Sequence, residues 1–127
     1  MIAILNYSIS TTCNTIKNFR KLVANIILMN RLEAFTPEIN RLCKIYNVKK
    51  LYAFGSILTD EYGPESDIDL IVDFANIPIE EYADNYFDFK FSLQDVFNRP
   101  VDLLEEQAIK NPYFKKAVNQ QRQLVYG

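Results

Sequence analysis

The chain has 127 residues, of which 49% are hydrophobic and 24% charged, and its formal net charge is −2. This hydrophobic content excludes a disordered chain, and the length suits one compact domain. The acidic balance argues against general nucleic-acid binding, which relies on clustered Lys and Arg. The sequence contains no histidine, which excludes His-based catalytic triads and His-ligated zinc. Carboxylates are therefore the expected proton acceptors.

Residues 1–28 differ from the rest because they hold three basic residues and no acidic one, so residues 29–127 carry −5. We interpret residues 1–28 as an N-terminal extension outside the core: an appended start, a real helix or a targeting segment. Residues 29–127 are the expected domain. The apolar run Leu22–Met29 is too short to span a bilayer, so we expect no membrane segment. Cys13 and Cys43 are too few for a disulfide framework, which favours a cytoplasmic protein.

Beyond residue 28 the chain alternates between helix and strand patterns. Thr36-Pro37 is a typical helix start, because a capping hydroxyl precedes a proline at the first helical position. The expected elements are a helix from Thr36, strands Val48–Phe54 and Asp67–Phe74, a helix Ile79–Phe97, a strand Pro100–Leu104 and a last helix that begins at Asn111-Pro112 and extends to an inward-facing Val125. There is no internal repeat, linker or low-complexity tract, which indicates one compact unit.

Residues 54–74 are the most informative stretch. Gly55-Ser56 follows an apolar strand, and such a turn lets backbone N–H groups and a hydroxyl approach a phosphate. In the next strand, alternation places Asp67 and Asp69 on one face, about 6–7 Å apart along the chain, where they can bind a divalent cation. The alternative is that the strand begins at Ile68 and both carboxylates are solvated. A phosphate-binding turn and a carboxylate pair together describe a nucleoside triphosphate site with magnesium.

Two segments resemble the signature of the minimal nucleotidyltransferases, small members of the polymerase β-like superfamily: Phe54-Gly55-Ser56 and, eleven residues after Ser56, Ser66-Asp67-Ile68-Asp69-Leu70. The resemblance extends from about Arg31 to Gly127. It implies an α+β (α/β-like) fold with a small mixed β-sheet flanked by helices. Such proteins carry a third carboxylate on a later strand, and Asp102 in Val101-Asp102-Leu103-Leu104 matches it.

The resemblance implies an enzyme that moves a nucleoside monophosphate, AMP from ATP, onto a hydroxyl. Its catalytic and metal-binding residues would be Asp67, Asp69 and Asp102, which would hold two Mg²⁺ ions. Gly55, Ser56 and Ser66 would bind the nucleotide. Many such proteins are MntA-type antitoxins that add AMP to a tyrosine of a helical HEPN-type ribonuclease. The expected partner is therefore a toxin of that kind.

The chain departs from the family pattern directly after Ser56. Family members often place an arginine there and this chain has Ile57, so one cation is missing from the phosphate side. Two alternatives stay open. The protein could be a partner-binding subunit without chemistry, or a small-molecule (aminoglycoside-type) transferase, which normally needs a second domain for its acceptor. The acceptor, the preferred nucleotide and the oligomeric state are left open by the sequence.

Overall fold

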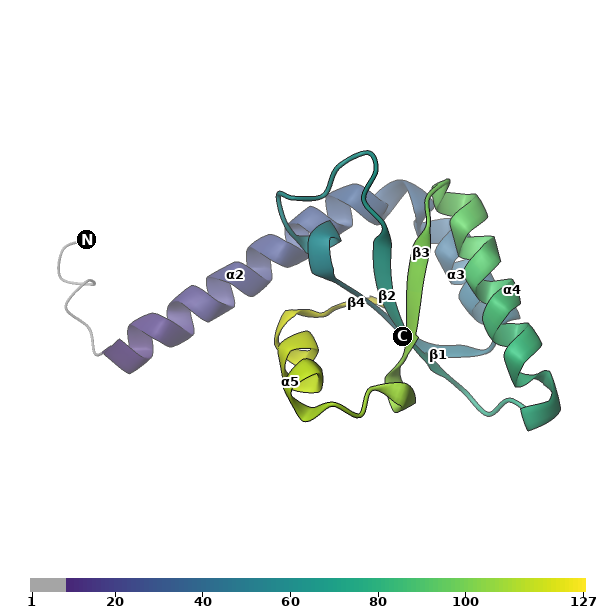
Figure 1. Cartoon of the computed structure of the whole chain (residues 1–127). Helices are drawn as coiled ribbons and strands as arrows, with labels where there is room; N and C mark the ends of the chain where they lie inside the picture. Colours follow the sequence, from purple (N-terminus) through teal and green to yellow (C-terminus); the bar gives the residue numbers. More distant parts are fainter. Residues whose placement is uncertain (1–8) are drawn as a thin grey trace.

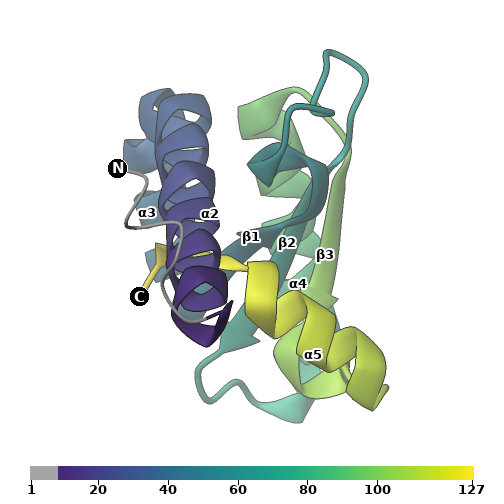
Figure 2. The same cartoon turned by 90° about the vertical axis from the view of Figure 1, so that its left-hand side faces the viewer.

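The computed structural model describes residues 9–127, with side chains from Thr15 onward (Figures 1 and 2). Its α-helices are α2 (Ile9–Leu32), α3 (Thr36–Ile45), α4 (Ile79–Phe97) and α5 (Pro112–Gln121). Its strands are β1 (Val48–Phe54), β2 (Ile68–Phe74), β3 (Val101–Glu105) and β4 (Gln123–Tyr126). Three short 3₁₀ helices lie between them: η1 (Glu33–Phe35), η2 (Gly55–Leu58) and η3 (Glu106–Ala108).

The strands form one mixed sheet in the order β3-β2-β1-β4. Strand β1 runs antiparallel to β2 and β4, whereas β2 and β3 are parallel. Parallel neighbours need a crossover connection, and α4 supplies it between β2 and β3 (Figure 1). The expected α+β fold with a small mixed sheet flanked by helices is confirmed.

The main core lies between one face of the sheet and helices α3 and α4. Alternation in β2 turns every second residue toward these helices, and all four are buried: Ile68, Leu70, Val72 and Phe74. Phe89 of α4 is fully buried, with its ring centroid 5.9 Å from that of Phe74. Each such side chain stabilises the fold by about 1.5–3 kcal/mol. The core therefore holds β2 in place, while the other face of the strand carries Asp69, the fully buried Ile71 and Asp73.

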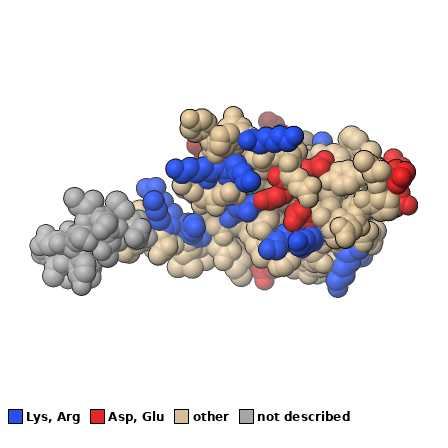
Figure 3. Space-filling model, turned by 90° about the horizontal axis from the view of Figure 1, so that it is seen from below, with Lys and Arg blue, Asp and Glu red and all other residues tan. Residues whose placement is uncertain are grey.

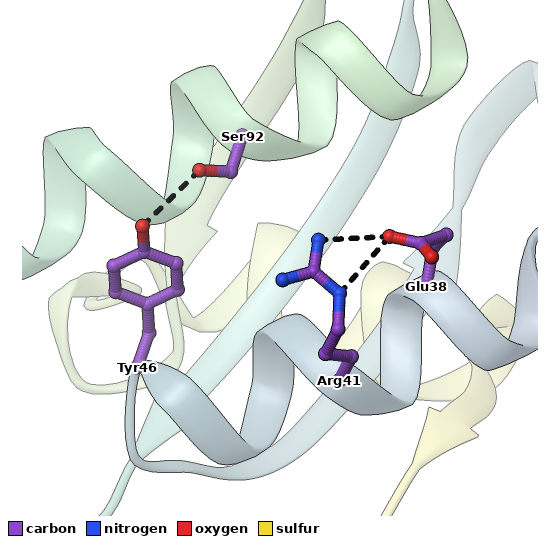
Figure 4. A network of polar contacts seen from close by, with 4 residues as sticks. All are labelled: Glu38, Arg41, Tyr46 and Ser92. Atoms are coloured by element: carbon purple, nitrogen blue, oxygen red, sulfur yellow. Dashed lines mark hydrogen bonds and ion pairs between the residues drawn. The ribbon is translucent and has the colours of Figure 1, made fainter.

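Side chains at the end of α3 join this helix to α4 (Figure 4). The hydroxyls of Tyr46 and Ser92 lie 3.2 Å apart, and Asn85 Nδ2 donates to the Tyr46 carbonyl oxygen at 2.9 Å. The ion pair between Arg41 and Glu38, also in Figure 4, lies on the exposed surface of α3. Exposed pairs of this kind contribute little to stability.

Four expected features differ from the structure. Strand β3 runs from Val101 to Glu105 rather than from Pro100 to Leu104. Strand β2 begins at Ile68, one residue after Asp67. Thr36 does not cap α3: the chain before it is already helical, and its hydroxyl donates to the Leu32 carbonyl oxygen at 3.3 Å. Asn111 does cap α5, accepting from the N–H groups of Tyr113 and Phe114. That helix ends at Gln121, however, and β4 then pairs with β1.

Helix α2 runs without a break across the expected boundary between residues 28 and 29. Leu28 and Leu32 are buried in the main core. Most of the other large apolar side chains of this helix are exposed: Ile16, Phe19, Leu22, Val23, Ile26 and Met29. In Figure 1 the N-terminal part of α2 extends beyond the rest of the protein, and Figure 3 shows Lys and Arg side chains on this part of the surface. Within residues 9–127, no helix is long and apolar enough to cross a membrane. The division into an extension and a domain stays a prediction.

Two truncated proteins would locate the start of the core. A chain beginning at Leu22 keeps Leu28 and a turn of helix before it, so its free energy of unfolding in urea should equal that of the full chain. A chain beginning at Met29 loses the buried Leu28 side chain and should be less stable by about 2 kcal/mol or more. Equal stability of the two would show that the core begins at Met29.

Candidate active site

Three strands bring their ends to the same edge of the sheet. Phe54, the last residue of β1, pairs with Asp69, the second residue of β2. Asp69 pairs in turn with Asp102, the second residue of the parallel strand β3. Adjacent strands lie about 4.8 Å apart, and paired residues point to the same face. Asp69 is half-buried and Asp102 exposed, so the two carboxylates are neighbours at the surface of this edge.

Asp67 lies just before β2 and is exposed. The pKa of Asp69 is raised by partial burial, and further by the negative charges of Asp102 and Asp67. Both of the other predicted carboxylates therefore act electrostatically on Asp69. A group of like charges repels unless a cation or a proton neutralises part of it.

Gly55 links the turn after β1 to these carboxylates. Its φ is +75°, a conformation that L side chains rarely adopt. A Cβ atom at this position would lie 2.5 Å from Asp69 Oδ2. Only glycine therefore allows the turn to pass so close to the Asp69 carboxylate, and the two parts of the sequence motif meet at this contact.

The two predicted serines lie at opposite ends of the loop between β1 and β2. The Ser56 carbonyl oxygen accepts from the backbone N–H and the hydroxyl of Thr59, at 2.9 and 3.0 Å. The Ser66 hydroxyl accepts from the Gly63 N–H at 2.9 Å and so closes the turn before Asp67. Their proposed contact with a nucleotide stays a prediction.

A family model for the nucleotidyltransferase domain matches residues 39–125. The chain belongs to this nucleotidyltransferase family. A proposed protein adenylyltransferase of Methanocaldococcus jannaschii is 39% identical over 75 residues, which are 59% of this chain and 74% of that protein. A second one from the same organism is 33% identical over 75 residues, with the same two shares.

Solved structures share the fold. A proposed minimal nucleotidyltransferase has a TM-score of 0.62 at 22% identity, covering 75% of this chain and 93% of the other. A toxin–antitoxin structure with AMP-PNP gives 0.57 at 20% identity, with 72% and 73% covered. A complex of tri-AMPylated Shewanella oneidensis HEPN toxin with its MNT antitoxin gives 0.52 at 19% identity, with 75% and 71% covered. This chain therefore has the fold of the minimal nucleotidyltransferases.

The donor set of this nucleotidyltransferase suits a hard divalent cation, because Asp67, Asp69 and Asp102 offer only carboxylate oxygens. A bound cation would offset the unfavourable effects of partial burial and of repulsion on the charged Asp69 carboxylate. Among the described residues, however, no group of three acidic, cysteine or histidine side chains is already gathered to hold a metal ion. Shared binding of an ion would therefore require the three carboxylates to turn toward one another.

A cavity of about 530 Å³ lies at the other end of β2 and β3, lined by residues 72–78, Tyr82 and residues 105–107. The Tyr82 hydroxyl donates to Glu105 Oε2 there at 2.5 Å. The pKa of Tyr82 is raised, chiefly by burial of its hydroxyl and secondly by this hydrogen bond. Asp73, at the cavity, is about 13 Å along the strand from Asp69. The predicted site therefore lies in the open at the opposite ends of these strands, separate from this cavity.

Sequence reasoning missed three residues around the loop between β1 and β2. The guanidinium carbons of Arg31 and Arg99 lie 4.8 and 4.4 Å from the ring centroid of Tyr62. Arg31 comes from α2 and Arg99 from the turn before β3. No local pattern marks either arginine, because each contact joins residues more than 30 positions apart in the chain.

A pair of glycine substitutions tests the contact between the turn and Asp69. Gly55→Ala should lower the free energy of unfolding by about 1–3 kcal/mol, because the added methyl group meets both a positive φ and the Asp69 carboxylate. Gly63→Ala is the matched control, since a Cβ there meets nothing within 4 Å. Its effect in urea denaturation should stay within about 0.5 kcal/mol. Equal effects would show that the approach of Gly55 to Asp69 is not tight.

The raised pKa of Asp69 predicts a pH dependence of stability in the metal-free protein. Above that pKa the folded state holds a charge that the unfolded chain tolerates better, so Asp69 lowers stability at neutral pH. As the pH falls through the raised pKa toward the ordinary pKa of an aspartate, folding takes up a proton and this loss is recovered.

Melting temperatures measured in chelator should therefore be equal or higher for Asp69→Asn than for the unchanged protein at pH 7. The difference should shrink as the pH falls. Asp88→Asn, on the exposed surface of α4, should follow the unchanged protein at every pH. An Asp69→Asn protein that is much less stable at pH 7 would show that this carboxylate stabilises the fold.

Proposed function

We propose that this nucleotidyltransferase moves AMP from ATP to a hydroxyl of a partner protein, as the antitoxin of a HEPN-type toxin. The observation that carries the proposal is the direct pairing of Asp69 with Asp102, next to Gly55. The names of the M. jannaschii relatives support protein adenylylation, and the AMPylated HEPN toxin complex among the structural neighbours supports the partner class.

In this proposal Gly55, Ser56 and Ser66 bind the nucleotide, while Asp67, Asp69 and Asp102 hold Mg²⁺. Bound magnesium would neutralise phosphate charge and lower the pKa of a coordinated hydroxyl. The acceptor oxygen attacks the α-phosphorus, and the bond from that phosphorus to the bridging oxygen of the β-phosphate breaks. Pyrophosphate leaves, and Asp102 accepts the hydroxyl proton.

The openness of the site favours a protein acceptor. Asp67 and Asp102 are exposed, and the cavity of about 530 Å³ lies at the far end of the same strands. A small acceptor would find few walls to hold it at such an edge, because small-molecule sites usually bury most of their ligand. A folded partner can instead bring its own surface and present one hydroxyl.

Transfer of label tests this function. The protein is incubated with α-³²P-labelled ATP and Mg²⁺, together with a helical HEPN-type toxin protein, kanamycin or RNA in separate reactions. Label should appear on the protein partner, and Asp69→Asn and Asp102→Asn should each reduce its rate by at least about 100-fold. Asp88→Asn is the matched control and should keep the full rate.

Other outcomes separate the alternatives. Label on kanamycin without any partner would identify a small-molecule transferase. A stable complex with the helical protein, together with no label and no binding of AMP-PNP in calorimetry, would identify a partner-binding subunit without chemistry.

A further inference from the structure

Tyr62 holds two arginines at the centre of the loop between β1 and β2. It contacts the guanidinium groups of Arg31 and Arg99, which come from opposite sides of the loop in the sequence. Cation–π contacts contribute about 0.5–1 kcal/mol each at exposed sites and more when desolvated. We call Arg31, Tyr62 and Arg99 the arginine clamp.

Arg31 fastens the first part of the loop. Its Nη1 donates to the carbonyl oxygens of Ile57 at 2.6 Å and Thr59 at 2.7 Å, and lies 3.5 Å from that of Ser56. The Ser56 carbonyl already accepts from Thr59, whereas those of Ile57 and Thr59 lie at the end of η2 and just after it, where a short helix leaves acceptors without helical partners. A positive charge is favourable at such an end. Arg31 thus fixes the backbone directly after Gly55-Ser56.

Arg99 fastens the last part of the loop. Its Nη1 donates to the carbonyl oxygens of Gly63 at 2.7 Å and Ser66 at 3.3 Å. Ser66 is the residue before Asp67, so this contact fixes the backbone directly before the first carboxylate. Hydrogen bonds from charged groups contribute about 1.5–3 kcal/mol each, enough to order a short loop segment.

We propose that the arginine clamp is a positioning device for the active site, which makes α2 part of that site although it lies outside the matched residues 39–125. The inference rests on the proposed function, because it assigns the clamp to nucleotide binding. Residues 59–67 have no regular helix or strand, and fixing one residue's backbone costs about 1–2 kcal/mol. The clamp orders the loop before a nucleotide binds, so that Ser56 and Asp67 are already in place and the ordering does not weaken binding.

The proposal explains how the turn carries a cation although Ile57 stands where relatives often have arginine. Ile57 is fully buried in the main core, so its side chain cannot face a phosphate. Its carbonyl oxygen, however, accepts from Arg31. The cation at this turn therefore comes from a helix that is distant in the sequence.

Binding of AMP-PNP with Mg²⁺, measured by calorimetry, tests the clamp. Arg31→Gln, Arg99→Gln and Tyr62→Leu should each weaken binding by about 10- to 100-fold, because an unclamped loop must be ordered during binding. Tyr62→Phe keeps the ring and should stay within about twofold of the unchanged protein. Arg41→Gln removes only an exposed pair and should do the same.

Hydrogen exchange provides a second readout, which separates a positioning role in the loop from a structural role in the whole sheet. In each clamp variant the amides of residues 57–67 should exchange at least tenfold faster, while those of β1 and β2 keep their protection. Saturating AMP-PNP should restore protection of the loop. Arg31→Lys keeps one charged donor and should give an intermediate affinity, and it replaces Arg31→Gln if that variant fails to fold.

The outcomes separate this inference from the proposed function. If the unchanged protein does not bind AMP-PNP, both are overturned. If the unchanged protein binds and the clamp variants bind equally well, the clamp is overturned and the proposed function stands. A loss of protection throughout the sheet in every clamp variant would overturn the positioning role in favour of a structural one.

Discussion

The pairing of β2 with β3 in one particular register is the constraint on which the site depends. A shift of one residue would turn Asp102 toward the helices and bring Leu103 to the face of Asp69. Two apolar residues oppose this shift, since Val101 and Leu103 are each only 3% exposed on the core face. The Tyr86 hydroxyl also donates to the Leu103 carbonyl oxygen at 2.6 Å. The hydrophobic pattern of one face thus sets the position of the carboxylates on the other.

Partial burial of the Asp69 carboxylate, and after it the negative charges of Asp102 and Asp67, opposes folding, as the raised pKa of Asp69 shows. The positive φ of Gly55 adds a second locally unfavourable feature at the same edge. Burial of the opposite face of β2 offsets both, because each of its buried side chains contributes favourably: Ile68, Leu70, Val72 and Phe74. Concentrating unfavourable features at one edge while the remaining core stays apolar is typical of a functional site.

The site motif could be predicted because its parts are local. Gly55-Ser56 and Asp67 to Asp69 lie within 15 residues, and the turn and the strand each have their own pattern. Asp102 could be identified as a site residue only through the family resemblance. Strand β4 could not be predicted, since four residues acquire strand character only through pairing with β1. Thr36 failed as a cap for a related reason: η1 joins α2 directly to α3, so no free helix start exists there.

At Ile57 the chain departs from the family pattern, and a contact from the distant Arg31 accompanies this departure. Ile57 adds a fully buried side chain to the core, where an unpaired arginine charge would be costly. Once that side chain points inward, the carbonyl oxygens of Ile57 and Thr59 need a donor from elsewhere, and Arg31 provides it. The last turn of α2 that carries Arg31 is itself anchored by Leu28 and Leu32. The turn beside the carboxylates thus depends on the packing of α2, through the hydrogen bond between Arg31 and Ile57, which lie 26 positions apart.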